Sequence, residues 1–447
     1  MSSVGLRFSD FFGMKNVPLF LILGIYLPGS IFGLYLFRDQ EALDFLLLLV
    51  LFLLIYVSSY GFLSRLSGRA SRLFFQGFKI PSYFWYVLAG LAVSVYLLSI
   101  VYAVFIADAI PLFVALQGGS LIDIAQARSQ FLAGLSGYES LVRYFVFILG
   151  RSVMPLVLVA SFFYAAKFRY LLFGSLIFLS MLSMEKAGPI FVILPLVFYF
   201  LFVGKWKSFL VLLGVMVLSV SAISFLALGG NSDTGFRGGE QVDELVVSQE
   251  VPIKEAQGDS LRFSLYDFYR KKTTGVLEYY SIENRLVYVL NRIVWIPYVT
   301  AYDWLRVQRE VLEGRLTMGR SVSFIHLLYG EPKMHLEKMV YVYQFGPSPG
   351  GEGAANTVFF VDAKLAFGWV GVVVYCLLFT FFAAVIFSSR NPVLMISSLT
   401  CFVVASVSSL TATLLSGGLF IYLILAMILR ENGQDVSSRE ALSAQAK

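Results

Sequence analysis

Residues 17–37 read VPLFLILGIYLPGSIFGLYLF, a stretch without a charged side chain. A helix of about 20 such residues crosses the roughly 30 Å hydrocarbon core of a bilayer. Five further apolar runs of similar length occur along the chain, at residues 45–63, 83–107, 144–166, 208–228 and 365–388. These runs predict an all-α polytopic membrane protein.

Four shorter apolar runs, at residues 170–184, 190–203, 392–411 and 415–429, predict further spans and bring the expected total to about ten. The composition agrees with this fold class, because 58% of the 447 residues are hydrophobic and only 14% are charged. The two cysteines, Cys376 and Cys401, lie within apolar runs, where neither a disulfide framework nor a thiolate metal site is expected.

The distribution of Lys and Arg predicts the orientation, since short cytoplasmic loops carry an excess of these residues. Ten alternating spans would place eleven basic residues on one side: Arg7, Lys15, Arg65, Arg69, Arg72, Lys79, Lys167, Arg169, Lys205, Lys207 and Arg390. The short loops opposite carry Arg38, Arg128, Arg143 and Lys186 among more numerous acids. We therefore expect a multi-pass protein of a bacterial inner membrane with both termini in the cytoplasm.

This topology divides the chain into four parts. Residues 1–228 would hold the first seven spans, residues 229–355 a large periplasmic loop, residues 356–430 the last three spans, and residues 431–447 a cytoplasmic tail. The loop begins with a polar stretch up to about Asp259. From Leu261 onward, aromatic and aliphatic residues return at helical spacing between charges of both signs, which predicts amphipathic helices at the membrane surface.

The periplasmic loop is rich in residues that could contact a sugar or a phosphate. Its aromatic side chains offer flat faces suited to sugar rings, although an interfacial aromatic belt is an equally ordinary interpretation. These side chains are Tyr279, Tyr280, Tyr288, Trp295, Tyr298, Tyr302, Trp304, Tyr341 and Tyr343. Both histidines of the chain, His326 and His335, also lie there. They have no neighbouring cysteine and no His-Glu-x-x-His pattern, so we expect neither a metal nor another cofactor.

One cation lies inside an apolar span. Arg151 follows Phe147-Ile148-Leu149-Gly150, about a third of the way in from the outer end. An arginine at that depth costs a few kcal/mol and is a functional candidate, unless it snorkels to the outer surface. Lys186 lies in the outer turn between two short spans, so both cations could face one outer-leaflet cavity. A diphosphate would suit such a cavity, because Arg offers paired donors and Lys a point charge.

Two local stretches resemble the Wzy-type O-antigen polymerases, which are relatives of the O-antigen ligases. Residues 353–362 (GAANTVFFVD), continuing to FGWVG at 367–371, are similar to the segment that leads from the periplasmic loop of these enzymes into the next span. Residues 184–189 (MEKAGP) are similar to their Lys-Gly hairpin. In some members Gly stands eleven positions after an Arg of the loop, whereas here Arg309–Gly319 and Arg320–Gly330 are each ten apart. The related ligases often carry His where this chain has Ala355.

The resemblance implies a GT-C-like fold and a metal-independent glycosyltransferase. The enzyme would transfer a glycan from undecaprenyl diphosphate onto another lipid-linked repeat unit at the periplasmic face, by positioning both substrates and stabilising the departing charge. The residues expected to bind phosphate are Arg151, Lys186, Arg285, Arg292, Arg309 and Arg320, with Arg128 a weaker candidate. The residues expected to activate the acceptor are His326, His335, Glu283 and Asp362.

The expected partners are the lipid-linked donor and acceptor and the membrane lipids, with a flippase and a chain-length regulator as further candidates. The basic residues follow the loops and form no nucleic-acid motif, so no nucleic acid is expected. Three other functions stay open. A flippase or transporter of the same lipid would be expected to show charges or broken helices in both halves, a ligase is the nearest enzymatic rival, and a scaffold leaves the clustered histidines unexplained.

Overall fold

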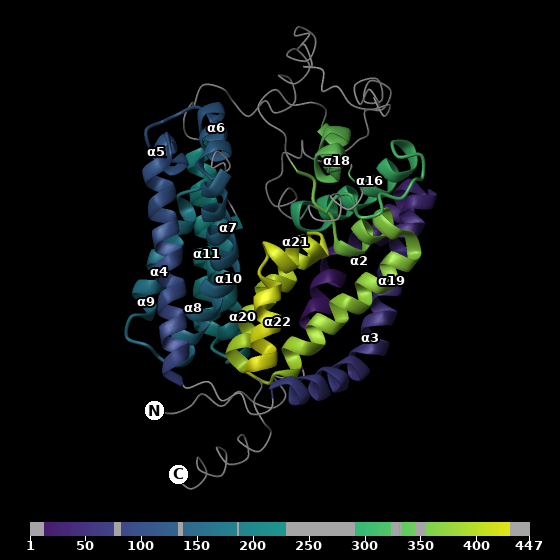
Figure 1. Cartoon of the computed structure of the whole chain (residues 1–447). Helices are drawn as coiled ribbons and strands as arrows, with labels where there is room; N and C mark the ends of the chain where they lie inside the picture. Colours follow the sequence, from purple (N-terminus) through teal and green to yellow (C-terminus); the bar gives the residue numbers. More distant parts are fainter. Residues whose placement is uncertain are drawn as a thin grey trace.

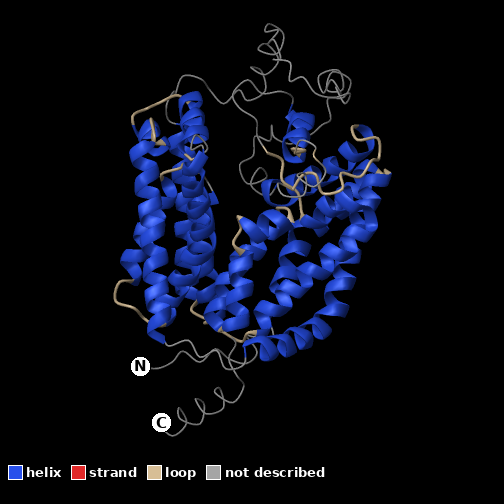
Figure 2. Cartoon of the chain, in the orientation of Figure 1, coloured by secondary structure: helices blue, strands red, loops and turns tan. Residues whose placement is uncertain are grey.

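The computed structural model describes residues 13–75, 82–132, 137–185, 187–228, 291–322, 330, 333–345 and 354–429. Within these residues the regular structure is entirely helical, as Figure 2 shows. Six stretches of it are long and apolar enough to cross a membrane. They comprise α2 (Val17–Phe37), α3 (Gln40–Phe75), α4 (Ser82–Ile106), α11 (Trp206–Leu228), α19 (Phe359–Ser388), and the continuous unit of α7 (Ser140–Ile148), η2 (Leu149–Val153) and α8 (Met154–Phe163). For the described residues, the prediction of an all-helical protein with several helices able to cross a membrane is confirmed.

The four shorter apolar runs also form helices. These are α9 (Arg169–Met181), α10 (Ala187–Phe202), α20 (Pro392–Ser406) and α22 (Leu419–Ile428). Smaller helices connect the long ones: α5 (Pro111–Leu116), α6 (Leu121–Phe131), η1 (Gly137–Glu139), η3 (Asn291–Trp295), α16 (Ile296–Glu310), α18 (Leu336–Phe345) and α21 (Leu410–Leu415).

The helices form two groups in Figure 1, with α4 to α11 in one and α2, α3, α16, α18, α19, α21 and α22 in the other. Helix α20 joins them, because it packs on α8 and α10 as well as on α2 and α22. The second group is centred on the pair α3 and α19, between which Phe52 stacks on Phe360 and meets Phe379 edge-on. Helices α5, α6, α16 and α18 lie at the same end of the molecule.

Two long helices differ from the apolar runs that predict them. Helix α3 continues to Phe75, well past residue 63, because a helix can extend beyond the hydrocarbon as long as its backbone hydrogen bonds are made. Helix α19 is broken at Phe367 and Gly368, and Gly368 has a φ of 65°. The freed carbonyls of Leu365 and Ala366 accept hydrogen bonds from the backbone N–H groups of Thr317 and Met318, at 2.9 Å each.

Helix α16 is a buried helix rather than one lying on the membrane surface. All residues from Tyr298 to Leu305 are buried, because α2, α3 and α19 cover the helix from one side and α18 from another. Its aromatic rings form part of this packing. Tyr302 stacks on Phe37 at 4.5 Å between centroids, and Tyr298 meets Phe45 edge-on at 5.2 Å. Trp295, Trp304 and Tyr343 are also buried, so these five rings offer no exposed face to a sugar.

Candidate functional site

The charged residues of α16 form a network that ties this helix to its neighbours. Arg309 makes ion pairs with Glu41 of α3 at 2.5 Å and with Glu310 at 3.2 Å. Glu310 also pairs with Arg306 at 3.2 Å and accepts a hydrogen bond from Tyr343 at 3.1 Å. Because Arg309 is bound to two carboxylates, its charge is compensated before any ligand arrives.

Asp303 is the most deeply buried acid of this network. Its side chain is 1% exposed, and one carboxylate oxygen accepts a hydrogen bond from Gln344 of α18 at 2.8 Å. Burial raises the pKa of Asp303 to about 7, and the nearby Glu310 adds to the effect, while Gln344 and Arg306 oppose it. This carboxyl group therefore joins α16 to α18.

The remaining candidate residues differ in their exposure, and the segment before His335 meets Arg320, because the Met334 N–H group bonds to the Arg320 carbonyl at 3.1 Å. Arg128, Arg292 and His335 are exposed. Arg320 is half-buried and donates a hydrogen bond to the carbonyl oxygen of Thr317 at 3.3 Å. Asp362 is 4% exposed in the first turn of α19. Four candidates lie outside the described residues: Lys186, Glu283, Arg285 and His326.

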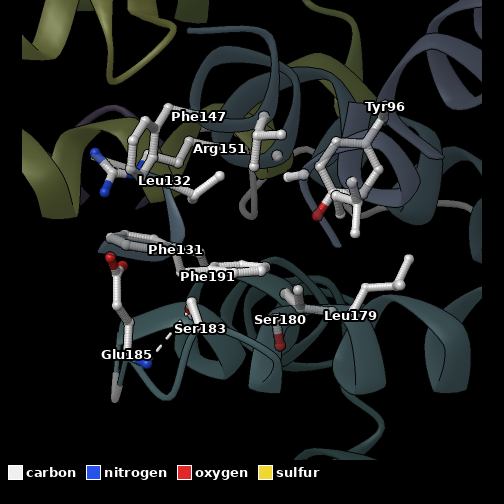
Figure 3. A pocket seen from close by; sticks show the side chains of 16 residues that line it. Tyr96, Phe131, Leu132, Phe147, Arg151, Leu179, Ser180, Ser183, Glu185 and Phe191 are labelled. Carbon is white, nitrogen blue, oxygen red and sulfur yellow. Dashed lines mark hydrogen bonds between the residues drawn. The ribbon is translucent and has the colours of Figure 1, made fainter. Parts of the chain in front are cut away.

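Arg151 differs from these residues because it lines a cavity. The cavity lies between α4, α7, η2, α9 and α10, and Phe131 and Leu132 at the end of α6 contribute to its wall (Figure 3). Its volume is about 80 Å³. The lining is mostly apolar, and the polar groups besides Arg151 are Tyr96, Ser180, Ser183 and Glu185. None of the other candidate arginines in the described residues lines it.

The local sequence explains how the backbone presents Arg151. Pro155 stands four residues later, lacks an N–H group and would clash with the Arg151 carbonyl in a regular α-helix. The helix widens here into the π-turn η2, in which the N–H group of Met154 bonds to the Leu149 carbonyl. Such single π-turns are frequent at functional sites. Gly150 lets α4 approach, because a Cβ atom there would lie 3.2 Å from the Tyr96 ring.

The Arg151 guanidinium lies between two aromatic rings. Its Cζ atom is 4.8 Å from the centroid of Phe147 and 5.3 Å from that of Phe191. Phenyl faces attract a cation but accept no strong hydrogen bond. The Glu185 carboxylate attracts the guanidinium electrostatically, and among the described residues no hydrogen bond or ion pair within 4 Å reaches it. The Glu185 side chain, in the turn between α9 and α10, lies on the same side of the cavity as the Arg151 guanidinium (Figure 3). The arrangement can present paired N–H donors to an anion.

Sequence reasoning identified Arg151 but missed the ring that contacts it from another helix. Phe191 comes from α10, and no local pattern marks it as a neighbour of Arg151. Pro155 was a usable signal, because a proline four residues after a buried arginine predicts a distorted turn at that arginine. No family model, curated protein or solved structure matches this chain.

Proposed function

We propose that this protein is a Wzy-type O-antigen polymerase that transfers a glycan from undecaprenyl diphosphate onto another lipid-linked repeat unit. The observation that carries the proposal is the Arg151 guanidinium in a cavity inside an apolar span. The two phenyl faces offset the few kcal/mol that an arginine costs inside a span, but they accept no strong hydrogen bond, so the N–H donors of Arg151 can bind an anion. Its bidentate donors suit a phosphate oxygen pair.

The size of the cavity indicates which part of the substrate it would bind. A volume of 80 Å³ has room for several water molecules and so for a phosphoryl group. We place the donor and acceptor sugars outside the cavity, toward the end of the molecule where α5, α6, α16 and α18 are found (Figure 1). Residues of the periplasmic loop would contact them there.

The reaction under this proposal is a displacement at the anomeric carbon. The acceptor hydroxyl oxygen forms the new bond, the bond between the anomeric carbon and the diphosphate oxygen breaks, and the diphosphate leaves with the electron pair. A base takes the proton of the hydroxyl. Arg151 would stabilise the charge that develops on the leaving diphosphate, which is electrostatic stabilisation by a donor already in position.

The membrane topology of the proposal has ten crossings, with both termini in the cytoplasm of a bacterial cell. Contacts at the outer end support it. Tyr302 of α16 donates a hydrogen bond to Asp39 in the turn between α2 and α3. The Leu112 N–H group of α5 bonds to the Leu182 carbonyl after α9, at 3.3 Å. Both contacts join connections that the proposed topology puts on the outer side.

Deletion of the gene tests the proposal. A polymerase mutant should keep a lipid core capped by a single repeat unit and lose the longer glycan ladder, with the ladder restored by the intact gene. Complete loss of surface glycan, including the single-unit form, would contradict the proposal and favour a flippase or a ligase.

A further inference from the structure

The π-turn that carries Arg151 is tied to a distant helix. The hydroxyl group of Tyr422, in α22, donates a hydrogen bond to the backbone carbonyl of Ser152 at 2.8 Å. The two residues are 270 positions apart in the sequence, and Tyr422 is fully buried. Ser152 is the residue directly after Arg151, so this contact acts on the backbone next to the guanidinium.

A π-turn needs such a contact because it disturbs the helical hydrogen-bond ladder. Here the Ser152 hydroxyl donates to the Ile148 carbonyl at 2.5 Å, and the Ser152 carbonyl accepts from Tyr422. Tyr422 thus stabilises the widened turn in the conformation that places Arg151 between Phe147 and Phe191.

Gly418 makes the approach of α22 possible. It stands one helical turn before Tyr422, at the start of α22, with a φ of 77° that an L side chain rarely adopts. A Cβ atom at this position would fall on the Ser152 side chain. Gly418 and Tyr422 therefore both face η2, and the turn at residues 416–418 serves as the contact surface for it.

We propose that Tyr422 is a positioning residue for Arg151, acting through the Ser152 carbonyl, with Gly418 providing the space for this contact. Its role in polymerisation rests on the proposed function, whereas its effect on the location of the guanidinium does not. Loss of the hydroxyl should let the π-turn relax toward other helical pairings. The guanidinium would then leave the space between the two rings more often.

Chemical labelling tests the location directly. The full-length protein in membrane vesicles is treated with phenylglyoxal, which modifies arginine, and the adduct on Arg151 is followed by peptide mass spectrometry. Tyr422→Phe should raise the labelling rate of Arg151 about fivefold, the size expected for one hydrogen bond. Gly418→Ala should raise it as well. Tyr26→Phe is the matched control, because the Tyr26 hydroxyl is also buried and donates to the Ser406 carbonyl of α20 at 2.9 Å rather than to η2. An unchanged rate in Tyr422→Phe, or an equal rise in Tyr26→Phe, would overturn the inference.

Polymer ladders give the second measurement. Tyr422→Phe should shorten the ladders in a background with Arg151 and have a much smaller effect in Arg151→Lys, which keeps partial activity, since a residue that acts only through the Arg151 guanidinium loses its effect with it. Additive effects of the two substitutions would refute positioning through Arg151. Altered labelling in a protein that makes no polymer would leave the positioning intact and refute the proposed function alone.

Discussion

Replacement of Arg151 by alanine should abolish polymerisation while the protein still reaches the membrane. The guanidinium lies 4.8 Å and 5.3 Å from two phenyl centroids, and a desolvated cation–π contact is worth about 2 kcal/mol. Two such contacts amount to at most about 4 kcal/mol, and an arginine within a span costs about 3 kcal/mol on insertion scales. These terms nearly cancel, so Arg151→Ala should change the membrane abundance little.

The effect on the reaction should be much larger. A lost donor to a developing anion costs about 3 kcal/mol of transition-state stabilisation, which slows the step more than a hundredfold. Arg151→Lys keeps the charge but loses the paired geometry, so it should retain partial activity. Both variants are compared in a strain lacking the gene, by the length of the glycan ladder and the amount of protein in the membrane.

Arg143→Ala is the matched control for this experiment. Arg143 lies on the same helical unit, over the ring of Tyr144 at 5.6 Å, and does not line the cavity. Its removal should leave the ladders unchanged. Normal ladders from Arg151→Ala would show that the guanidinium binds no substrate group and is held by the two rings alone.

Three further predictions concern topology, pH and packing. Reporter fusions at Arg69, Lys205 and the C-terminus should report the cytoplasm and one near Gln257 the outside, and any exchange between them would end the ten-span topology. Asp303 should make stability depend on pH, because its pKa is about 7 in the folded protein and about 3.9 in an unfolded chain. Between these values only the folded state holds the proton, so the free energy of unfolding should fall by on the order of 2 kcal/mol from pH 5 to pH 7. The unfolding temperature in detergent should fall with it, and Asp303→Asn should remove most of this dependence on pH. Gly29→Val should lower the free energy of unfolding by about 1 to 3 kcal/mol, because even a Cβ atom at this position lies 2.6 Å from the Cβ atom of Tyr298. Gly24→Val should be neutral in the same thermal assay, because a Cβ atom at Gly24 has no neighbouring atom within 4 Å.

The packing of α16 shows why part of the fold could not be predicted from the sequence. Its pattern of apolar and charged residues predicts a helix with one solvent-exposed face, and the structure contains this helix. The pattern contains no information about α18, which covers a second side and bonds to the buried Asp303 through Gln344. Burial of polar residues depends on partners elsewhere in the chain. Gln344 donates a hydrogen bond to Asp303, and Asp39 accepts one from Tyr302, so neither buried side chain is left without a partner.

The sequence by itself determined the helical fold class and the six long apolar helices, because crossing a bilayer requires length and apolarity, which are local properties. It also determined that Arg151 is unusual, because a charge within an apolar run is visible without any structure. Only the tertiary structure decided which groups surround that charge. Phe191 approaches it from α10 and Glu185 from the turn before α10, while Tyr422 of α22 bonds to the neighbouring backbone. Which segments meet depends on packing between parts of the chain that can be 270 residues apart.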